Sequence, residues 1–138
     1  MKKKIFIASD HAGYDMKTKL NNHFSSFIDL GTNSIDSVDY PDFAHKLTNE
    51  LLQNEGSLGI LICGTGVGMS IAANRTKGIR AGLANSAEIA RLIRQPNDAN
   101  VLVIPGRFMG DEEAKNCVQT FIDTQFEAGR HKKRIEKI

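Results

Sequence analysis

Short β-rich runs alternate with amphipathic segments along the whole chain. Five runs are rich in aliphatic and β-branched residues: residues 4–9, 27–31, 58–63, 79–84 and 100–106. Between them, apolar residues recur at helical spacing, in the sets Met16, Leu20, Phe24 and Phe27, then Phe43, Leu47 and Leu51, and then Ala114, Cys117, Val118, Phe121 and Ile122. Such alternation is typical of a parallel sheet covered by helices on both faces. We therefore expect an α/β fold, a doubly wound three-layer α/β/α sandwich with a five-stranded parallel sheet in the order 2-1-3-4-5.

Two helix starts carry recognisable signals. Ser86, followed by Glu88, is typical of the residue that caps a helix N-terminus. The segment GDEEA, residues 110–114, places acidic side chains in the first turn of the last long helix, where the helix dipole favours them.

The size of the chain indicates one domain, residues 1–138, with a basic C-terminal helix or tail from about residue 127. Its apolar runs are far shorter than the roughly 20 residues that span a bilayer, and no cleavage site follows the N-terminus, so we expect a cytoplasmic protein that does not enter membranes. Cys63 and Cys117 belong to no Cys-x-x-Cys or Cys/His cluster, so neither a disulfide framework nor a structural metal is expected. Cys117 lies in an apolar stripe and should be buried.

Positive charge is concentrated at the C-terminus. The net charge is +2, but the last ten residues carry +4, with Arg130, Lys132, Lys133, Arg134 and Lys137 against Glu136. Such a tail suits a solvated helix end, an anion clamp or a nucleic-acid arm. No aromatic residues are interleaved for base stacking, so we expect no nucleic-acid partner.

Motif-rich loops follow three of the expected strands. SDHAG (residues 9–13) follows the first, CGTGVG (63–68) follows the third, and Arg107 ends the PGR that follows the fifth. In open α/β sheets, ligands bind outside the carboxyl ends of the strands, at the point where the strand order reverses. The topology thus brings Asp10, His11 and Cys63 towards one crevice.

The CGTGVG loop suits an anion. Gly64, Gly66 and Gly68 do not match a dinucleotide-binding fingerprint, because Met69 stands where a third glycine belongs, and there is no ATP-binding G-x-x-x-x-G-K. Glycines before a helix let the backbone turn and present N–H groups to a phosphate or to an oxyanion formed during reaction. A cysteine there tends towards thiolate character, and a base beside an oxyanion hole suggests proton abstraction next to a carbonyl. The alternative is that Cys63 is merely tolerated at the strand end above a phosphate loop.

Five ordered segments together resemble the type B ribose-5-phosphate isomerases, over essentially the whole chain. They are ASDHAG near the N-terminus, VDYPDFA (38–44), GILICGTGVGMSIAANRTKGIRAGL (59–83), RQPNDANVLVIPGR (94–107) and FEAGRHKKRIEKI (126–138). Subunits of galactose-6-phosphate isomerase belong to the same superfamily. The resemblance implies a Rossmann-like domain that forms a homodimer or a dimer of dimers with shared active sites. It further implies interconversion of ribose 5-phosphate and ribulose 5-phosphate without metal or organic cofactor.

The resemblance also implies roles for the residues of the CGTGVG loop. Cys63 matches the base that moves a proton between C1 and C2 through a cis-enediolate. Thr65 matches a hydroxyl that helps a proton pass between the two oxygens. Asp10 matches a residue that binds the sugar hydroxyls and helps to open the ring. The oxyanion-hole positions of the family match Gly64, Gly66, Val67 and Gly68.

Sugar and phosphate contacts are implied elsewhere. His11 matches a contact on the phosphate side, and Tyr40 and Asn97 match sugar-binding positions, the region of Asn97 reaching the site of a neighbouring subunit. The family's phosphate-binding arginines match Arg107, Arg130 and Arg134, and the spacing of the last two suits one helical face. Simpler interpretations exist: Asp10 and His11 as helix caps, Tyr40 as a packed turn residue, and Arg107 as a surface charge.

One position departs from the family. Type B enzymes have a histidine before NDAN that is assigned to ring opening, whereas this chain has Pro96, whose side chain neither titrates nor donates a hydrogen bond. Three explanations compete: ring opening passes to Asp10 or His11, the substrate arrives open, or the residue was deliberately replaced. The alternative functions are isomerisation of a six-carbon aldose phosphate, of the galactose-6-phosphate or allose-6-phosphate type, and sugar-phosphate binding with weakened catalysis.

Overall fold

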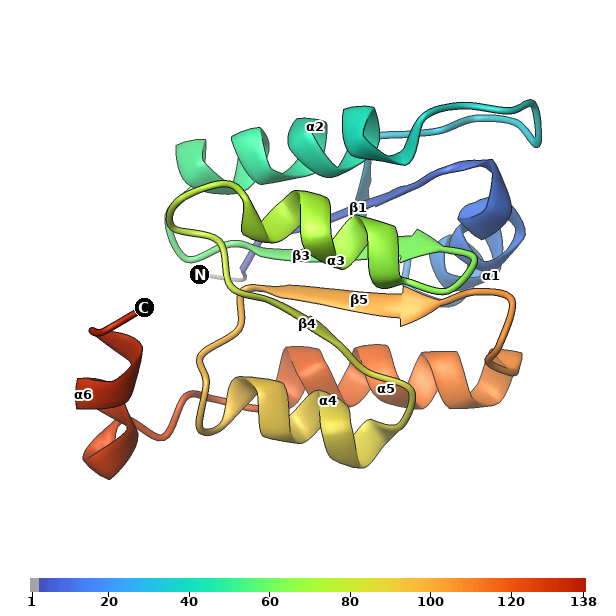
Figure 1. Cartoon of the computed structure of the whole chain (residues 1–138). Helices are drawn as coiled ribbons and strands as arrows, with labels where there is room; N and C mark the ends of the chain where they lie inside the picture. The colour runs from blue at the N-terminus through green and yellow to red at the C-terminus, as the bar shows by residue number, and fades with distance from the viewer. Residues whose placement is uncertain (1–2) are drawn as a thin grey trace.

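Five parallel strands form one sheet in the computed structural model, which describes residues 3–138 (Figure 1). The strands are β1 (Ile5–Ser9), β2 (Ile28–Asp29), β3 (Leu58–Cys63), β4 (Ala81–Leu83) and β5 (Val101–Pro105). The α-helices are α1 (Tyr14–His23), α2 (Tyr40–Gln53), α3 (Val67–Asn74), α4 (Ala87–Arg94), α5 (Asp111–Asp123) and α6 (Lys132–Ile135). Two short 3₁₀ helices, η1 (His11–Gly13) and η2 (Gly129–His131), precede α1 and α6. The α/β fold and the position of every expected strand are confirmed.

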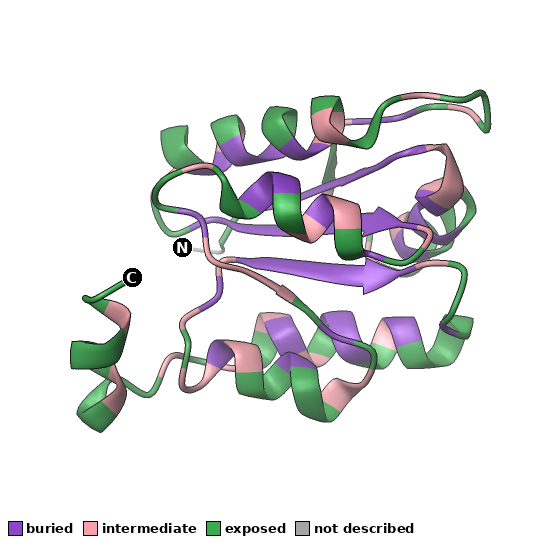
Figure 2. Ribbon diagram, in the orientation of Figure 1, coloured by how far each residue is buried: buried purple, intermediate pink, exposed green. Residues whose placement is uncertain are grey.

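The sheet is the middle layer of a three-layer sandwich. On one face, α2 and α3 pack against alternate residues of the strands, such as Phe6, Leu61 and Val103. On the other face, α1, α4 and α5 cover the intervening residues, such as Ile7 and Ile60. Buried residues therefore line both sides of the central strands, and the helices expose their outer faces (Figure 2). Strands covered on both faces are read from sequence as continuous apolar runs, which is the pattern of residues 58–63 and 100–106.

The strand order is β2-β1-β3-β5-β4, so the expected order 2-1-3-4-5 is wrong for the last two strands. β5 pairs with β3 along its length and β4 lies at the edge, paired only with β5. All five residues of β5 are buried, whereas the three residues of β4 are intermediate or exposed. The more apolar strand takes the position that water does not reach, because burial of apolar surface is the main favourable term in folding.

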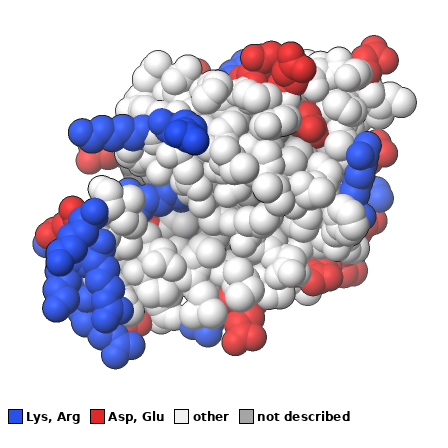
Figure 3. Space-filling view, viewed as in Figure 1, with Lys and Arg blue, Asp and Glu red and all other residues white. Residues whose placement is uncertain are grey.

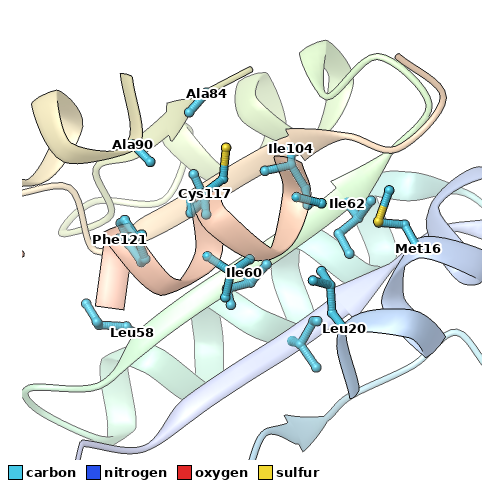
Figure 4. Packing of buried hydrophobic residues seen from close by; sticks show 14 of the residues in the cluster. Met16, Leu20, Leu58, Ile60, Ile62, Ala84, Ala90, Ile104, Cys117 and Phe121 are labelled. Carbon is cyan, nitrogen blue, oxygen red and sulfur yellow. The ribbon is translucent and has the colours of Figure 1, made fainter. Parts of the chain in front are cut away.

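The core beneath β3 joins residues far apart in the sequence. Met16 and Leu20 of α1 and Cys117 and Phe121 of α5 belong to one cluster with Ile60 and Ile62 of β3, and Met16 lies beside Ile62 (Figure 4). Cys117 is fully buried as expected, and burial, with a smaller contribution from the charge of Glu113, raises the pKa of its thiol to about 11. This thiol is therefore a core residue without nucleophilic character at neutral pH.

Helix boundaries follow the sequence signals with one exception. The Ser86 side chain accepts a hydrogen bond from the Ile89 N–H at the start of α4, and three acidic residues occupy the first turn of α5. However, α1 ends at His23, so Phe24 lies just beyond the helix that its spacing predicted. Phe24 and Phe27 instead stack on each other, 4.9 Å between ring centroids, and pack against the core from the connection to β2.

The C-terminal segment stands apart from the layers. No residue of η2 or α6 is buried, and α6 lies beside the amino-terminal edge of the sheet (Figure 1). The Glu127 N–H donates to the Gln95 carbonyl at 2.8 Å, which ties the start of this segment to the end of α4. Within residues 3–138, each helix is too short or too polar to cross a bilayer.

Candidate active site

The loops that follow β1, β3 and β5 meet at the carboxyl edge of the sheet. Backbone hydrogen bonds join these loops. The Asp10 N–H donates to the carbonyl of Ile62, the Gly106 N–H to the carbonyl of Cys63 at 2.8 Å, and the Arg107 N–H to the carbonyl of Gly64 at 3.0 Å. Neighbouring parallel strands end at the same edge, so the polar residues that follow them are held side by side. The structure thus brings together the predicted residues of all three loops.

Cys63 is the last residue of β3 and is only 5% exposed. Its Sγ accepts a hydrogen bond from the backbone N–H of Gly66 at 3.2 Å. The sulfur therefore points into the turn that leads to α3. A sulfur that receives a backbone N–H is well placed to carry negative charge, since hydrogen bonds to charged groups are the stronger ones.

Two glycines shape this turn through close contacts. Gly66 has φ = 80°, a left-handed conformation that L side chains rarely adopt. A Cβ on Gly68 would lie 2.7 Å from two ring carbons of Tyr40, the first residue of α2. Tyr40 therefore rests directly on the turn after Cys63, and this contact leaves no room for a Cβ at position 68 unless the ring or the turn moves.

The backbone amides of the turn divide into engaged and available groups. The Gly66 N–H is used by Cys63, and the Val67 N–H donates to the Thr65 Oγ1 at 3.2 Å. The N–H groups of Gly64 and Gly68 find no acceptor among residues 3–138. Of the four predicted oxyanion-hole positions, Gly64 and Gly68 thus have amides free to hold a developing negative charge.

Asp10 and His11 are held in fixed orientations beside Cys63. Asp10 is buried, and its Oδ1 accepts the Gly13 N–H at 3.0 Å, so it caps η1. Its Oδ2 receives no hydrogen bond from residues 3–138. The His11 Nδ1 accepts the Val38 N–H at 3.1 Å, which leaves Nε2 to carry the proton of the neutral ring. The capping role of Asp10 is present, and it leaves one carboxylate oxygen for a ligand.

A polar cavity of about 450 Å³ adjoins this group. His11 and Arg107 line it together with Lys19, Asp111 and Asp15. The side-chain stem of Arg107 lies against Gly64, where an added Cβ would be 3.2 Å from its Cδ. Because the Lys19 Nζ already pairs with Asp111 at 3.1 Å, Arg107 is the cation of this cavity without an acidic partner among residues 3–138.

A second cavity, of about 370 Å³, adjoins the Cys63 loop at Thr65. Thr65 lines it with Leu83, Asn85, Pro105 and Phe108. Sequence reasoning missed Leu83, Asn85 and Phe108. A signal for them existed, because they end or follow β4 and β5 and therefore reach the same edge of the sheet as Cys63.

Four of the predicted positions lie elsewhere in the same chain. Pro96 and Asn97 belong to the connection from α4 to β5, and Arg130 and Arg134 belong to η2 and α6. Both segments lie at the amino-terminal edge, opposite the end towards which the arrowheads of β3 and β5 point (Figure 1). A single chain does not bring these residues to Cys63. Arg130 and Arg134 also fall in two successive helices of different type, not on one regular α-helix.

In the part of the chain that the structure describes, residues 3–138, no three His, Cys, Asp or Glu side chains are grouped so as to ligate a metal ion. The groups gathered at the candidate site are a cysteine, backbone amides, a carboxylate, an imidazole and a guanidinium. These groups are suited to moving protons and holding anions.

Comparison with known proteins gives matches along the whole chain. Residues 5–138 match the family model described as Ribose/Galactose Isomerase. The ribose-5-phosphate isomerase B of Escherichia coli strain K12 is 43% identical, with 99% of this chain and 94% of that protein covered.

Two solved structures have nearly the same backbone. A ribose 5-phosphate isomerase from Thermotoga maritima is 51% identical with a TM-score of 0.95, over 99% of this chain and 97% of that one. The ribose-5-phosphate isomerase B of Mycoplasma genitalium, solved with bound ribulose-5-phosphate, is 45% identical with a TM-score of 0.95, over 99% of this chain and 94% of that one.

Proposed function

The chain belongs to the ribose/galactose isomerase family and is an isomerase, and on this premise we propose that it interconverts ribose 5-phosphate and ribulose 5-phosphate with Cys63 as the base. The observation that carries the assignment of the base is the position of Sγ. It lies at the carboxyl end of the central strand β3 and accepts the Gly66 N–H, in the same loop as the free amides of Gly64 and Gly68.

The proposed chemistry needs only proton transfers. In the open-chain aldose, Sγ of Cys63 removes the proton on C2, and the electron pair moves into a C1–C2 double bond while the carbonyl oxygen gains negative charge. The resulting cis-enediolate is held by backbone N–H groups, for which Gly64 and Gly68 are available. Thr65 relays a proton between O1 and O2, and the Cys63 thiol returns its proton to C1 to give the ketose.

Asp10 and His11 are proposed to hold the rest of the sugar. The free Oδ2 of Asp10 accepts a sugar hydroxyl and assists ring opening. The Nε2–H of His11 and the guanidinium of Arg107 face one cavity, and both suit an anionic oxygen. We place the substrate phosphate in that cavity. Tyr40, which rests on Gly68, forms one wall on the sugar side.

A complete site is proposed to need two copies of the chain. Asn97, Arg130 and Arg134 lie at the edge of the sheet opposite Cys63, so they contact a substrate only if a second copy presents them. The surface around α3 and β4 supports such packing, because it is largely uncharged (Figure 3) and exposes Val67, Ile71, Leu83 and Phe108. We therefore propose a homodimer in which each amino-terminal edge completes the partner's site.

Solvent hydrogen exchange tests Cys63 directly. In heavy water, an active base introduces deuterium at C1 or C2 of the sugar phosphate even when net turnover is slow, and proton NMR follows this. The Cys63→Ala protein should lose the exchange, whereas Cys117→Ala, the matched cysteine control, should keep it. Full exchange by Cys63→Ala would remove this cysteine from the mechanism. Absence of exchange by the wild-type protein would favour a sugar-phosphate-binding protein.

Hybrid dimers test the shared site. Cys63→Ala and Arg134→Gln each impair every site of their own homodimer. In a hybrid of the two, one site has both defects and the other has neither. An equal mixture that re-equilibrates should therefore recover about a quarter of wild-type activity. A mixture as inactive as its components would contradict the shared site without affecting the role of Cys63.

The family description includes galactose, so a six-carbon aldose phosphate is the alternative substrate. A product assay across ribose 5-phosphate, allose 6-phosphate and galactose 6-phosphate decides between them. We expect the highest kcat/KM with ribose 5-phosphate. A higher value with a six-carbon substrate would reassign the substrate and leave the chemistry of Cys63 unchanged.

A further inference from the structure

A polar cavity of about 570 Å³ opens at the amino-terminal edge of the sheet, away from Cys63. Its lining includes Ser57 and Leu58 at the start of β3, Arg80 before β4, and Asn100 before β5. Arg94 of α4 and Asp98 complete the polar side. None of these residues belongs to the proposed catalytic group, so this cavity has no assigned role.

Arg94 brings an incompletely used guanidinium to the cavity. The residue is only 4% exposed. Its Nη1 donates to the Asp98 Oδ1 at 3.0 Å and to the Ala99 carbonyl at 2.8 Å, and its Nε donates to the Thr124 carbonyl at 3.1 Å. The Nη2 finds no acceptor among residues 3–138. This nitrogen is open to the cavity and not fully buried, so a ligand there can accept a hydrogen bond from it.

Arg80 adds a second guanidinium that shares the same carboxylate. Its Nε donates to the Asp98 carbonyl at 2.8 Å and its Nη2 to Asp98 Oδ2 at 3.2 Å. One carboxylate thus faces two guanidiniums, which leaves one positive charge uncompensated. Of the other charged residues that line the cavity, Lys3 adds positive charge, and Glu55 is exposed and makes no salt bridge with residues 3–138.

Ser57 supplies an unpaired hydroxyl. The residue is 8% exposed, and its buried Oγ has no hydrogen-bond partner in the described part of the chain. This oxygen is closed off from the cavity, so a ligand there meets the guanidiniums and not the hydroxyl. A water molecule would satisfy the Nη2 of Arg94, but it would leave the excess positive charge. An anionic oxygen group satisfies the hydrogen bonds and the charge together.

We propose that this cavity is a second ligand site, which binds the phosphate or carboxylate group of a small metabolite through Arg80 and Arg94. Its volume is within the range of sites for small organic molecules. The bound anion competes with Asp98 for the two guanidiniums. Because Asp98 directly follows Asn97, a change in the contacts of Asp98 on anion binding also changes the surroundings of the turn that carries Pro96 and Asn97.

Site-resolved NMR of backbone amides tests this on the full chain, titrated at constant ionic strength with inorganic phosphate and, separately, with malonate. Amides of Ser57, Arg80 and Asp98 report on the cavity, and those of Gly64 and Gly68 report on the catalytic site. We expect both groups to shift with phosphate, each with its own dissociation constant. Asn97 should shift with the cavity group.

Variants identify the ligand groups. Arg80→Gln should abolish the shifts at the cavity and leave those at Gly64, whereas Arg75→Gln, which removes the same charge from an exposed position, should leave both. Ser57→Ala should leave cavity binding unchanged and should not lower the free energy of unfolding, because it removes an unpaired hydroxyl that is closed off from the cavity.

Two outcomes separate the proposals. Cavity amides that do not move with either anion, while Gly64 and Gly68 shift, would show that the cavity holds water and overturn this inference. Cavity shifts without any shift at Gly64 or Gly68 would sustain it and contradict the proposed phosphate binding at the catalytic site.

Discussion

Replacement of Gly68 by alanine should place a methyl group against the ring of Tyr40. The added Cβ would lie 2.7 Å from two ring carbons, well inside van der Waals contact, so the ring or the turn after Cys63 must move. Overpacking of this kind costs about 1–3 kcal/mol. Alanine in a helix is favoured over glycine by about 1 kcal/mol, and position 68 is the second residue of α3. In the wild-type background, the two effects oppose each other, and the net change in the free energy of unfolding should be about zero to 2 kcal/mol of destabilisation.

A double-mutant cycle isolates the contact. In a Tyr40→Ala background, the clash is absent, so Gly68→Ala should stabilise the protein by about 1 kcal/mol. The interaction free energy between positions 40 and 68 should therefore be about 1–3 kcal/mol. Urea unfolding at a fixed protein concentration measures each corner of the cycle, since stability depends on concentration if the chain dimerises. Gly110→Ala is the matched control: an alanine Cβ there has no neighbour within 4 Å, so its effect should be the same with and without Tyr40. Equal effects of Gly68→Ala in the two backgrounds would refute the contact.

Three further perturbations follow from the structure. Because burial raises the pKa of Cys117 to about 11 from 9.0, the unfolded chain loses this proton first. Stability should fall by up to about 2–3 kcal/mol between pH 9 and 11, and urea unfolding of Cys117→Ala should lack that component. Lys17 is 1% exposed and its Nζ lies 2.6 Å from the Oδ2 of Asp29. Asp29→Ala leaves the buried charge of Lys17 without a partner and should lower the free energy of unfolding by about 3 kcal/mol. Lys17→Met should cost less, because it leaves the Asp29 carboxylate partly in water. A larger loss for Lys17→Met than for Asp29→Ala would contradict this. Pro96→His should raise kcat on ribose 5-phosphate more than on ribulose 5-phosphate, which has no furanose form; equal changes, with kcat and KM compared separately, would contradict a ring-opening deficit.

The residues of the carboxyl edge could be predicted because chain order and strand direction decide them. Cys63 ends an apolar run, Asp10 follows another, and Arg107 follows a third, so parallel strands must bring them to the same edge. The contacts among them could not be predicted. That Tyr40 rests on Gly68, or that the Gly66 N–H faces Sγ, depends on how α2 packs on the sheet and on the φ of one glycine.

The resemblance of the sequence segments assigned Asn97, Arg130 and Arg134 to one site with Cys63, the region of Asn97 coming from a neighbouring subunit, and the chain folds all three to the other edge. A motif records which residue types occur and in what order, but it does not say which copy of the chain supplies each one. The position of α6, without a buried residue and beside the amino ends of the strands, is what separates these residues from Cys63. The shared site was only an expectation from the family, and the fold of one chain supplies a geometric reason for it.

By itself, the sequence determined the strands, most helix boundaries, the α/β class and the loops that carry the candidate chemistry. The spacing of apolar residues along a strand or helix and the capping of a helix both depend on residues close together in the chain. These features could therefore be predicted from local patterns. Only the tertiary structure decided that β5 lies between β3 and β4, that the Gly64 and Gly68 amides remain free, and that Arg80 and Arg94 converge on Asp98. Each of these depends on burial and on contacts between segments that are distant in the sequence. Strands with similar local sequence, such as β4 and β5, compete for the same place in the core.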